Sequence, residues 1–240
     1  METPRDAPLS YPEDPMWLRY RHEFAEHYHE VFYQASPIIR HVQESAHRTM
    51  ERPFRSDRQF PRVLEVGAGA GEHLPFVRHG FEHYLMIDLD EAILEQARQN
   101  ARHRPEVECR VMDARNLAFP DHYFDRLISV FNLEHLSEPY RVLREWARVV
   151  RPGGVISIAI PTEGGMAWEL GRTLTTRRIF RKKGFDWDYI VARDHVNSCR
   201  QILSFVRHDF PNRREYWYPL GLPNHHINLT FTCNLFLEKP

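Results

Sequence analysis

The chain has 240 residues, of which 42% are hydrophobic and 27% charged, a composition typical of a globular protein with room for one full α/β domain. Its 32 basic and 33 acidic residues leave a formal net charge of −1. No overall field therefore favours nucleic acid or an anionic membrane as a partner. Three widely spaced cysteines form neither a disulfide framework nor a zinc knuckle, and no run approaches the ~20 apolar residues of a membrane span. Because the polar, proline-rich N-terminus also lacks the apolar core of a signal peptide, we expect a cytoplasmic protein without an integral membrane segment.

Residues 16–50 predict one or two helices, interrupted near Ser36-Pro37, where Ser36 can cap the second helix. These helices carry an aromatic stripe that must be buried somewhere, namely Trp17, Tyr20, Phe24, Tyr28, Phe32 and Tyr33. We interpret residues 1–55 as a helical lid, with Tyr20 as a substrate contact. The alternative is that the stripe is ordinary core or an oligomer contact.

From Arg62 onward, strands alternate with helices, which predicts a doubly wound, mostly parallel sheet over residues 60–161. We expect strands at "RVLEV", "HYLMIDL", "VECRVM", "DRLISVF" and "VISIAIP", the last starting after a helix that breaks at Pro152-Gly153-Gly154. The segment from Gly71 to about Gly80 is expected to be helical, and Ser137 is expected to cap the helix that contains Pro139. Residues 162–211 predict a helical insertion that caps the substrate. Residues 212–240 predict two β segments that close the sheet of this single domain.

The segment "VLEVGAGAGEHLP" joins the first strand to a glycine-rich turn, a common way to hold a nucleotide. Asp88 ends the second strand about 20 residues on, where a carboxylate can accept both ribose hydroxyls. A dinucleotide site and an S-adenosylmethionine site both begin in this way. Glu65 favours the second, because a carboxylate there opposes a pyrophosphate but suits a ligand with ammonium and sulfonium charges. A surface-facing glutamate at a strand end is the alternative.

Three later segments follow the same order along the chain: "VMDARNLAFPDHYFDRLIS", "FNLEHL" and "REWARVVRPGGVISIAIP". With "LEVGAGAG" and "MIDLDEAILEQAR", they resemble the class I S-adenosylmethionine-dependent methyltransferases, especially the small-molecule branch. The resemblance implies a Rossmann-like, seven-stranded sheet whose last strand runs antiparallel to the others. More loosely, the C-terminal half resembles bacterial methyltransferases associated with surface polysaccharides and lipid-linked glycans. Relatives there commonly have glutamate before the histidine, where this chain has Asp194.

Transferred residue by residue, the resemblance implies a site for S-adenosylmethionine. Its methionine and ribose side would be lined by Glu65, Gly67, Ala68, Gly69 and Gly71. The ribose hydroxyls would bind Asp88, and adenine would meet Leu89, Asp113 and the backbone amide of Ala114. The methionine moiety would face Phe131 and Asn132. Asp125 is expected to tie down the backbone at the entrance of its strand.

The acceptor side is predicted from isolated residues. His135 in "LEHL" and His195 in "ARDHVN" are our candidates for a catalytic base. The alternative for His135 is a structural histidine that bonds to the backbone, and the alternative for His195 is a place in a helix-capping segment. The basic stretch at 172–183 suggests an anion site with Arg177 and Arg178, against a solvated face or a membrane-surface contact. We expect no metal site. His22, Glu26 and His29 share a helix face but are interpreted as solvated charge, and nothing else shows zinc-ligand spacing.

These features predict a methyltransferase that uses S-adenosylmethionine and acts on a small-molecule or glycan-like acceptor at oxygen. An amine or a carbon nucleophile of the quinone or natural-product type is the alternative acceptor. A NAD-dependent oxidoreductase, opposed by Glu65 and Asp113, and a non-catalytic methyltransferase-like subunit are the rival classes. Nucleic acid is not expected as the substrate, because "FNLE" stands where an Asn-Pro-Pro-Tyr-type segment would follow the fourth strand.

Overall fold

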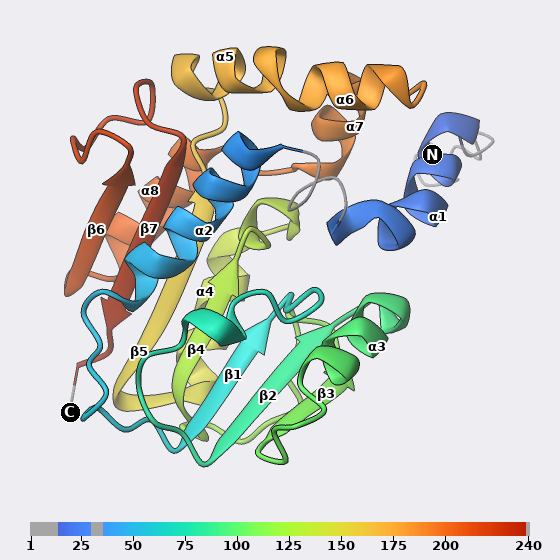
Figure 1. Ribbon diagram of the computed structural model, residues 1–240. Coiled ribbons are helices and arrows are strands. Elements are labelled where there is room, and N and C mark those ends of the chain that lie inside the picture. The colour runs from blue at the N-terminus through green and yellow to red at the C-terminus, as the bar shows by residue number, and fades with distance from the viewer. Residues whose placement is uncertain (1–13, 30–35, 239–240) are drawn as a thin grey trace, which may run out of the picture.

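One seven-stranded sheet, in the order β3-β2-β1-β4-β5-β7-β6, organises the molecule (Figure 1). The structure is a computed structural model, described here for residues 14–29 and 36–238. The first five strands are β1 (Arg62–Val66), β2 (His83–Asp88), β3 (Val107–Val111), β4 (Phe124–Val130) and β5 (Val150–Pro161). The sheet is completed by β6 (Arg213–Tyr218) and β7 (Thr230–Phe236). Strands β1 to β5 are parallel, and β7 runs antiparallel to both β5 and β6, which confirms the predicted sheet.

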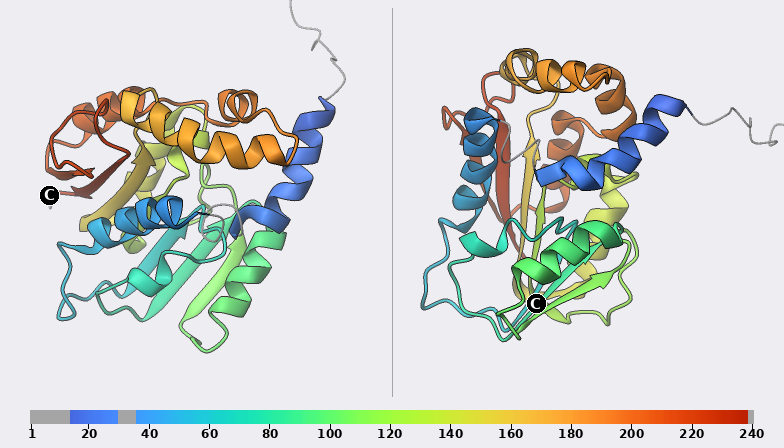
Figure 2. Two further views of the ribbon diagram at one scale, coloured as in Figure 1. Left: turned by 45° about the horizontal axis from the view of Figure 1, so that its top comes forward. Right: turned by 45° about the vertical axis from the view of Figure 1, so that its right-hand side comes forward.

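Helices cover both faces of this sheet, as the nearly continuous burial of β4 and β5 requires (Figures 1 and 2). On one face lie α4 (Pro139–Val149) and α8 (Cys199–Asp209), where Trp146 is fully buried and its indole Nε1 donates to the Ala114 carbonyl at 2.9 Å. On the other face, α2 (Pro37–Glu51) and α3 (Glu91–Asn100) bury Met50 and Ala97. The carboxyl ends of the parallel strands are left as the edge at which a ligand can bind.

The predicted cap at Ser36 is confirmed, and so is the role of Asp125. The Ser36 hydroxyl accepts from the Ile39 amide at the start of α2, and Ser198 caps α8 in the same way. Asp125 accepts the Arg62 amide at 2.7 Å, joining the entrances of β4 and β1.

Three local predictions are wrong. The segment after Gly71 holds only a 3-10 turn, η2 (Leu74–Phe76), because Gly71 is left-handed (φ 83°) and Pro75 lacks an amide hydrogen. Helix α4 is capped at Glu138, one residue later than Ser137. Strand β5 begins at Val150 and runs through the proline-glycine segment, because the register with β4 shifts between Phe124 and Arg126 and accommodates the extra residues.

The segment between β5 and β6 forms the predicted helical insertion, with α5 (Met166–Leu174), α6 (Thr176–Lys182), α7 (Trp187–Asp194) and then α8. Helix α1 (Pro15–His29) lies beside α6 and α7 in both figures. Tyr20 is buried there, with ring centroids 6.0 Å from Phe185 and 6.4 Å from Trp187. The N-terminal segment and the insertion therefore meet at one place. A lid function of residues 1–55 stays a prediction. The boundaries of the four predicted segments, 1–55, 60–161, 162–211 and 212–240, also stay predictions. Phe32, Tyr33 and the side chains of Phe24 and Tyr28 lie outside the described residues.

Within the described part of the chain, every helix is too short or too polar to cross a membrane.

Candidate active site

The glycine turn after β1 is pressed against the loop that follows β4. Gly67, Gly69 and Gly71 all have positive φ (62°, 56° and 83°), a region that strains other residues. A Cβ at Gly67 would lie 2.3 Å from Cγ of Asn132, so no side chain fits there. The turn thus requires glycine for both its conformation and its close approach to Asn132, and it leaves backbone amides at the carboxyl edge of the sheet.

Asp88, at the end of β2, holds this turn in place. Its Oδ2 accepts from the Gly69 amide at 3.1 Å, and its Oδ1 accepts from the Asp90 amide at 3.0 Å. Burial raises the pKa of the Asp88 carboxyl, and these backbone hydrogen bonds oppose that shift. Leu89, the next residue, is 60% exposed. An anchored carboxylate beside an exposed apolar side chain can bind a ribose and the flat ring attached to it.

Glu65 lies inside β1 and is 3% exposed. The Tyr84 hydroxyl donates to its Oε2 at 2.7 Å. Burial raises the pKa of Glu65 to about 8, so a positively charged ligand would relieve the cost of ionising this carboxyl. A surface-facing glutamate is therefore ruled out by its burial.

Asp113 and Ala114, the predicted contacts to adenine, lie just after β3. The Asp113 carboxylate is bound by its neighbour Arg115, with Nη2 2.6 Å from Oδ2, and this hydrogen bond lowers the pKa of Asp113. The Asp113 side chain is 30% exposed. Ala114 is buried, and its carbonyl is the acceptor for Trp146. Asp113 stays ionised here and can still accept another hydrogen bond.

These residues fit S-adenosylmethionine by the chemistry of the donor set. A glycine cradle, an anchored acid at the end of β2 and a buried acid in β1 suit an adenosine that carries positive charge. The roles of the individual residues, from Glu65 to Asn132, stay predictions.

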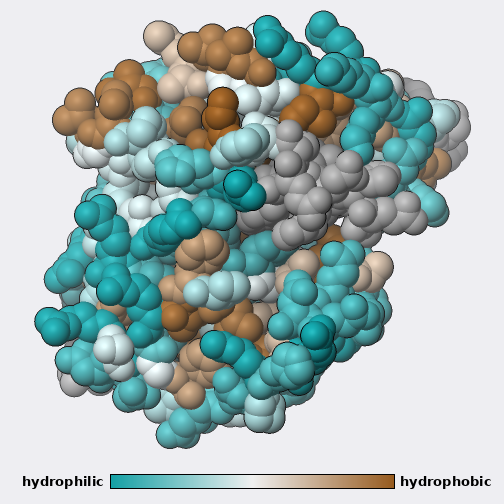
Figure 3. Space-filling view, in the orientation of Figure 1, coloured by the Kyte–Doolittle hydropathy of each residue, from teal (hydrophilic) through white to brown (hydrophobic). Residues whose placement is uncertain are grey.

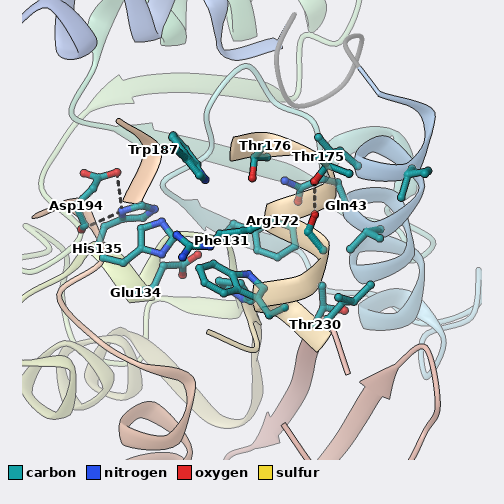
Figure 4. A pocket seen from close by; sticks show the side chains of 18 of the residues that line it. Gln43, Phe131, Glu134, His135, Arg172, Thr175, Thr176, Trp187, Asp194 and Thr230 are labelled. Atoms are coloured by element: carbon teal, nitrogen blue, oxygen red, sulfur yellow. Dashed lines mark hydrogen bonds and ion pairs between the residues drawn. The ribbon is translucent and has the colours of Figure 1, made fainter. Parts of the chain in front are cut away.

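A cavity of about 200 Å³ lies beyond Phe131, between the sheet edge and the insertion (Figure 4). Its walls come from α1, α2, the loop after β4, the end of β5, helices α5 to α7 and the start of β7. Phe131 (φ 51°) lines this cavity, and the next residue, Asn132, is the one that lies against the glycine turn. The cavity therefore adjoins the glycine turn. The lining is mainly apolar and aromatic, and it includes Tyr20, Ile39, Val42, Trp168, Trp187 and Leu229.

Both predicted histidines lie in this cavity. The rings of His135, in η3 (Leu133–His135), and His195, after α7, are 4.6 Å apart at 87°. Each has a carboxylate partner. His195 Nδ1 lies 2.5 Å from Glu163 Oε2, and His135 Nδ1 lies 3.3 Å from Asp194 Oδ2. Burial alone would lower the pKa of His135, but the hydrogen bond to Asp194 and the charge of Glu134 outweigh it and raise this pKa to about 9.

We expected no metal site because the sequence shows no zinc-ligand spacing. The fold nevertheless brings together three possible metal ligands whose spacing in the sequence does not reveal them. Ligand atoms of His135, Asp194 and His195 lie within 4.8 Å of one another, close enough to hold a metal ion. Spacing misses the group because the insertion carries Asp194 and His195 back to the loop after β4. Of the helical set first considered, His22 is exposed, and the side chains of Glu26 and His29 lie outside the described residues.

The structure places the two predicted acceptor arginines away from the cavity lining. Arg177 pairs with Asp188, with Nε 2.6 Å from Oδ1, and also contacts Glu169, while Arg178 is exposed. In the same basic stretch it is Arg172 that lines the cavity, held over the Trp168 ring at 4.3 Å. The acids that neutralise Arg177 lie on α5 and α7, so an inspection of residues 172–183 alone could not find them.

Several residues in or beside the cavity were not predicted from the sequence, namely Gln43, Glu134, Trp168, Arg172 and Thr176 in its lining and Glu163, which contacts His195. One of these residues could have been found from its position in the sequence. Glu163 follows β5 at the carboxyl edge of the sheet, where functional acids are expected in this type of fold.

Comparison with known proteins agrees with this geometry. Residues 64–158 match a family model described as a methyltransferase domain. Phosphatidylethanolamine N-methyltransferase of Cereibacter sphaeroides is 42% identical over 100 residues, covering 40% of this chain and 49% of the relative. The 27-O-demethylrifamycin SV methyltransferase of Amycolatopsis mediterranei is 32% identical over 116 residues, covering 44% and 42%. The chain thus spans about half the length of these curated relatives.

A solved S-adenosylmethionine-dependent methyltransferase of Thermotoga maritima shares the fold, with a TM-score of 0.60 at 16% identity over 93% of this chain and 99% of the other. The fold and the glycine turn thus agree with the methyltransferase domain that is matched over residues 64–158. Residues 64–158 therefore carry a methyltransferase domain, and the methyl donor that this match and the fold imply is S-adenosylmethionine.

Proposed function

We propose that this chain methylates an oxygen atom of a small-molecule or glycan-like acceptor bound in the cavity beside the glycine turn. The observation that carries the proposal is the convergence of two histidine–carboxylate pairs on a cavity that shares Phe131 with the cofactor side. A hydroxyl is a weak nucleophile, and a positioned base accelerates its reaction by roughly 10²–10⁴-fold. When bound, S-adenosylmethionine supplies an electrophilic methyl group.

The two pairs suit different tasks. Glu163 accepts a hydrogen bond from His195 Nδ1, which leaves Nε2 to take the proton of the acceptor hydroxyl. The pKa of His135, by contrast, is about 9, so this side chain holds its proton at neutral pH and suits the role of base less well than His195. In its place beside Asp194, His135 orients the acceptor and offsets the negative charge of Glu134. Tyr20 and the insertion would exclude water from the reacting atoms.

Two of the relatives fit a small acceptor without fixing the atom, whereas others are named for tRNA. One is named for methylation at nitrogen and another for an antibiotic oxygen. An amine is the second candidate, because the carboxylates of Glu134 and Asp194 line the cavity, Glu163 contacts His195 beside them, and these charges would attract an ammonium group. Three free cysteines fit a reducing compartment, which supports a cytoplasmic site of action.

A screen with isotope-labelled S-adenosylmethionine tests the proposal. The purified chain is incubated with acceptor classes that present hydroxyl, amine or carbon nucleophiles, and label transfer is measured. We expect transfer to hydroxyl compounds that is lost in His195→Gln. Transfer only to amines would favour the second candidate, and binding of NAD without S-adenosylmethionine would overturn the function.

A further inference from the structure

The cavity walls carry polar atoms that are buried and yet lack a hydrogen-bond partner among the described residues. Buried polar groups are nearly always paired, and each unpaired one costs about 1–3 kcal/mol, so a cluster of them needs an explanation. Several of the lining residues contribute one or more such atoms: Gln43 Oε1, Glu134 Oε2, Arg172 Nε and Nη1, Thr176 Oγ1 and Thr230 Oγ1. Glu134 and Thr230 are each 2% exposed, and Thr176 is 8% exposed. A ligand in the cavity could supply the hydrogen-bond partners that these atoms lack.

The atoms form two opposing walls (Figure 4). Gln43, Arg172 and Thr176 lie together on one side of the cavity, and Glu134 lies on the other side with His135 and Asp194. Phe131 and Trp187 stand between the two walls. A ligand that satisfies both walls must therefore carry polar groups at opposite ends and a compact body that packs against aromatic rings.

The donor and acceptor types on these walls define the chemistry further. Gln43 Oε1 and Glu134 Oε2 require donors from the ligand, whereas Arg172 Nε and Nη1 require acceptors. The hydroxyls of Thr176 and Thr230 can do either. A hydroxyl group is both donor and acceptor, so a molecule with several hydroxyls meets all of these requirements. A quinol has only two hydroxyls, on a flat ring, so it meets fewer of these requirements. An acyl chain has no hydroxyl and meets none of them.

We propose that the acceptor is a sugar: a pyranose-type ring whose hydroxyls bridge the two walls while its C–H faces pack against Phe131, Trp168 and Trp187. The hydroxyl to be methylated lies at the Glu134 wall, beside the two histidines. Gln43, Arg172 and Thr176 bind hydroxyls at the far end of the ring and so determine specificity. This inference rests on the proposed methyl transfer and names its substrate class.

The test measures binding separately from transfer. Methyl glycosides of glucose, mannose, galactose and glucuronic acid are compared with 1,4-dihydroxynaphthalene by ligand-observed NMR, in the presence of S-adenosylhomocysteine. Thr176→Val and Gln43→Leu remove one polar group each and nearly preserve shape, and Thr230→Val gives a third, independent variant. Thr173→Val is the matched control, because Thr173 is exposed on α5 outside the cavity lining. Thermal melting checks that every variant is folded.

We expect at least one glycoside to bind, and each cavity variant to weaken it about 2- to 10-fold while Thr173→Val has no effect. Failure of every glycoside to bind would overturn the inference, and so would glycoside binding that none of the cavity variants weakens. The labelled-cofactor assay on the same compounds separates the two claims. Glycoside binding without any methyl transfer counts against the proposed function alone. Transfer to the naphthalenediol without glycoside binding counts against the sugar alone.

Discussion

The cofactor side and the acceptor side of this site are built from different kinds of contact. On the cofactor side, Gly67, Gly69 and Asp88 lie in or beside two adjacent strands, and backbone hydrogen bonds fix their positions. On the acceptor side, single side chains arrive from α2, the loop after β4 and the insertion, and several of their polar atoms are unpaired among the described residues. The first region is thus held in a fixed arrangement, as the proposed cofactor site requires. The acceptor side is formed by elements outside the parallel strands, and we expect these elements to determine which acceptor binds.

The outer surface of the insertion also differs from the side that faces the cavity. Figure 3 shows hydrophobic atoms over α5 and hydrophilic atoms over α6, along the top of the molecule. The inner sides of these two helices supply Arg172 and Thr176 to the cavity. One helical layer thus separates solvent from the cavity, and substitutions on its two sides are expected to act differently.

The largest expected effect comes from removing the base. In His195→Gln we expect kcat to fall by about 10²–10⁴-fold, because the acceptor hydroxyl loses its proton acceptor, while cofactor affinity stays unchanged. Steady-state kinetics and calorimetry with S-adenosylhomocysteine measure the two quantities. His208→Gln is the matched control, since the side chain of His208 is 85% exposed on α8. Equal activity of the two variants would show that His195 has a structural role.

A smaller effect is expected from Asp88→Ala, on the other side of the comparison. Losing charge-assisted hydrogen bonds to the ribose hydroxyls should weaken cofactor binding by roughly 1.5–3 kcal/mol and leave the acceptor KM alone. Asp57→Ala, at a side chain that is 79% exposed, controls for loss of an acid. Unchanged cofactor affinity in Asp88→Ala would mean that this carboxylate only anchors Gly69 and Asp90.

The sequence predicted the two regions unequally, for a physical reason. The strands, the glycine turn and Asp88 follow from local patterns, since period, turn chemistry and strand ends are encoded within a few residues. The cavity is different, because Glu163 and His195 are 32 positions apart and meet only through packing of the insertion. Even locally, Pro75 and the left-handed Gly71 outweighed the helical appearance of the segment after the turn. The arginine that lines the cavity could not be chosen within 172–183, because the partners of Arg177 come from other helices.

Glu65 offers a pH-dependent test of the cofactor side. Its folded-state pKa of about 8 means that it is protonated at neutral pH and must lose a proton to face a cation. Affinity for S-adenosylmethionine should therefore rise with pH up to about 8 and level off above it, by at most about tenfold per pH unit. Calorimetry in buffers of different ionisation enthalpy measures the released proton. Glu65→Gln should remove both the proton release and this rise, and an identical pH profile in the variant would assign the dependence to another group.

The smallest effect is expected on the outer side of the insertion. Arg177 is already paired with Asp188 and Glu169, and Arg178 and Arg181 are exposed, so replacing all three with glutamine removes charges that lie outside the cavity lining. Exposed ion pairs contribute about 0–1 kcal/mol, which limits the rise in acceptor KM to roughly fivefold. Any rise should vanish at high salt, because screening removes a long-range attraction for an anionic acceptor. Replacing Arg55, Arg102 and Arg104 with glutamine makes the same change of charge on exposed loops that lead into β1 and β3, and it should leave KM unaltered. If the triple variant on α6 behaves like this control, the basic stretch is a solvated face. A KM rise that persists at high salt would instead place one of these arginines in contact with the acceptor.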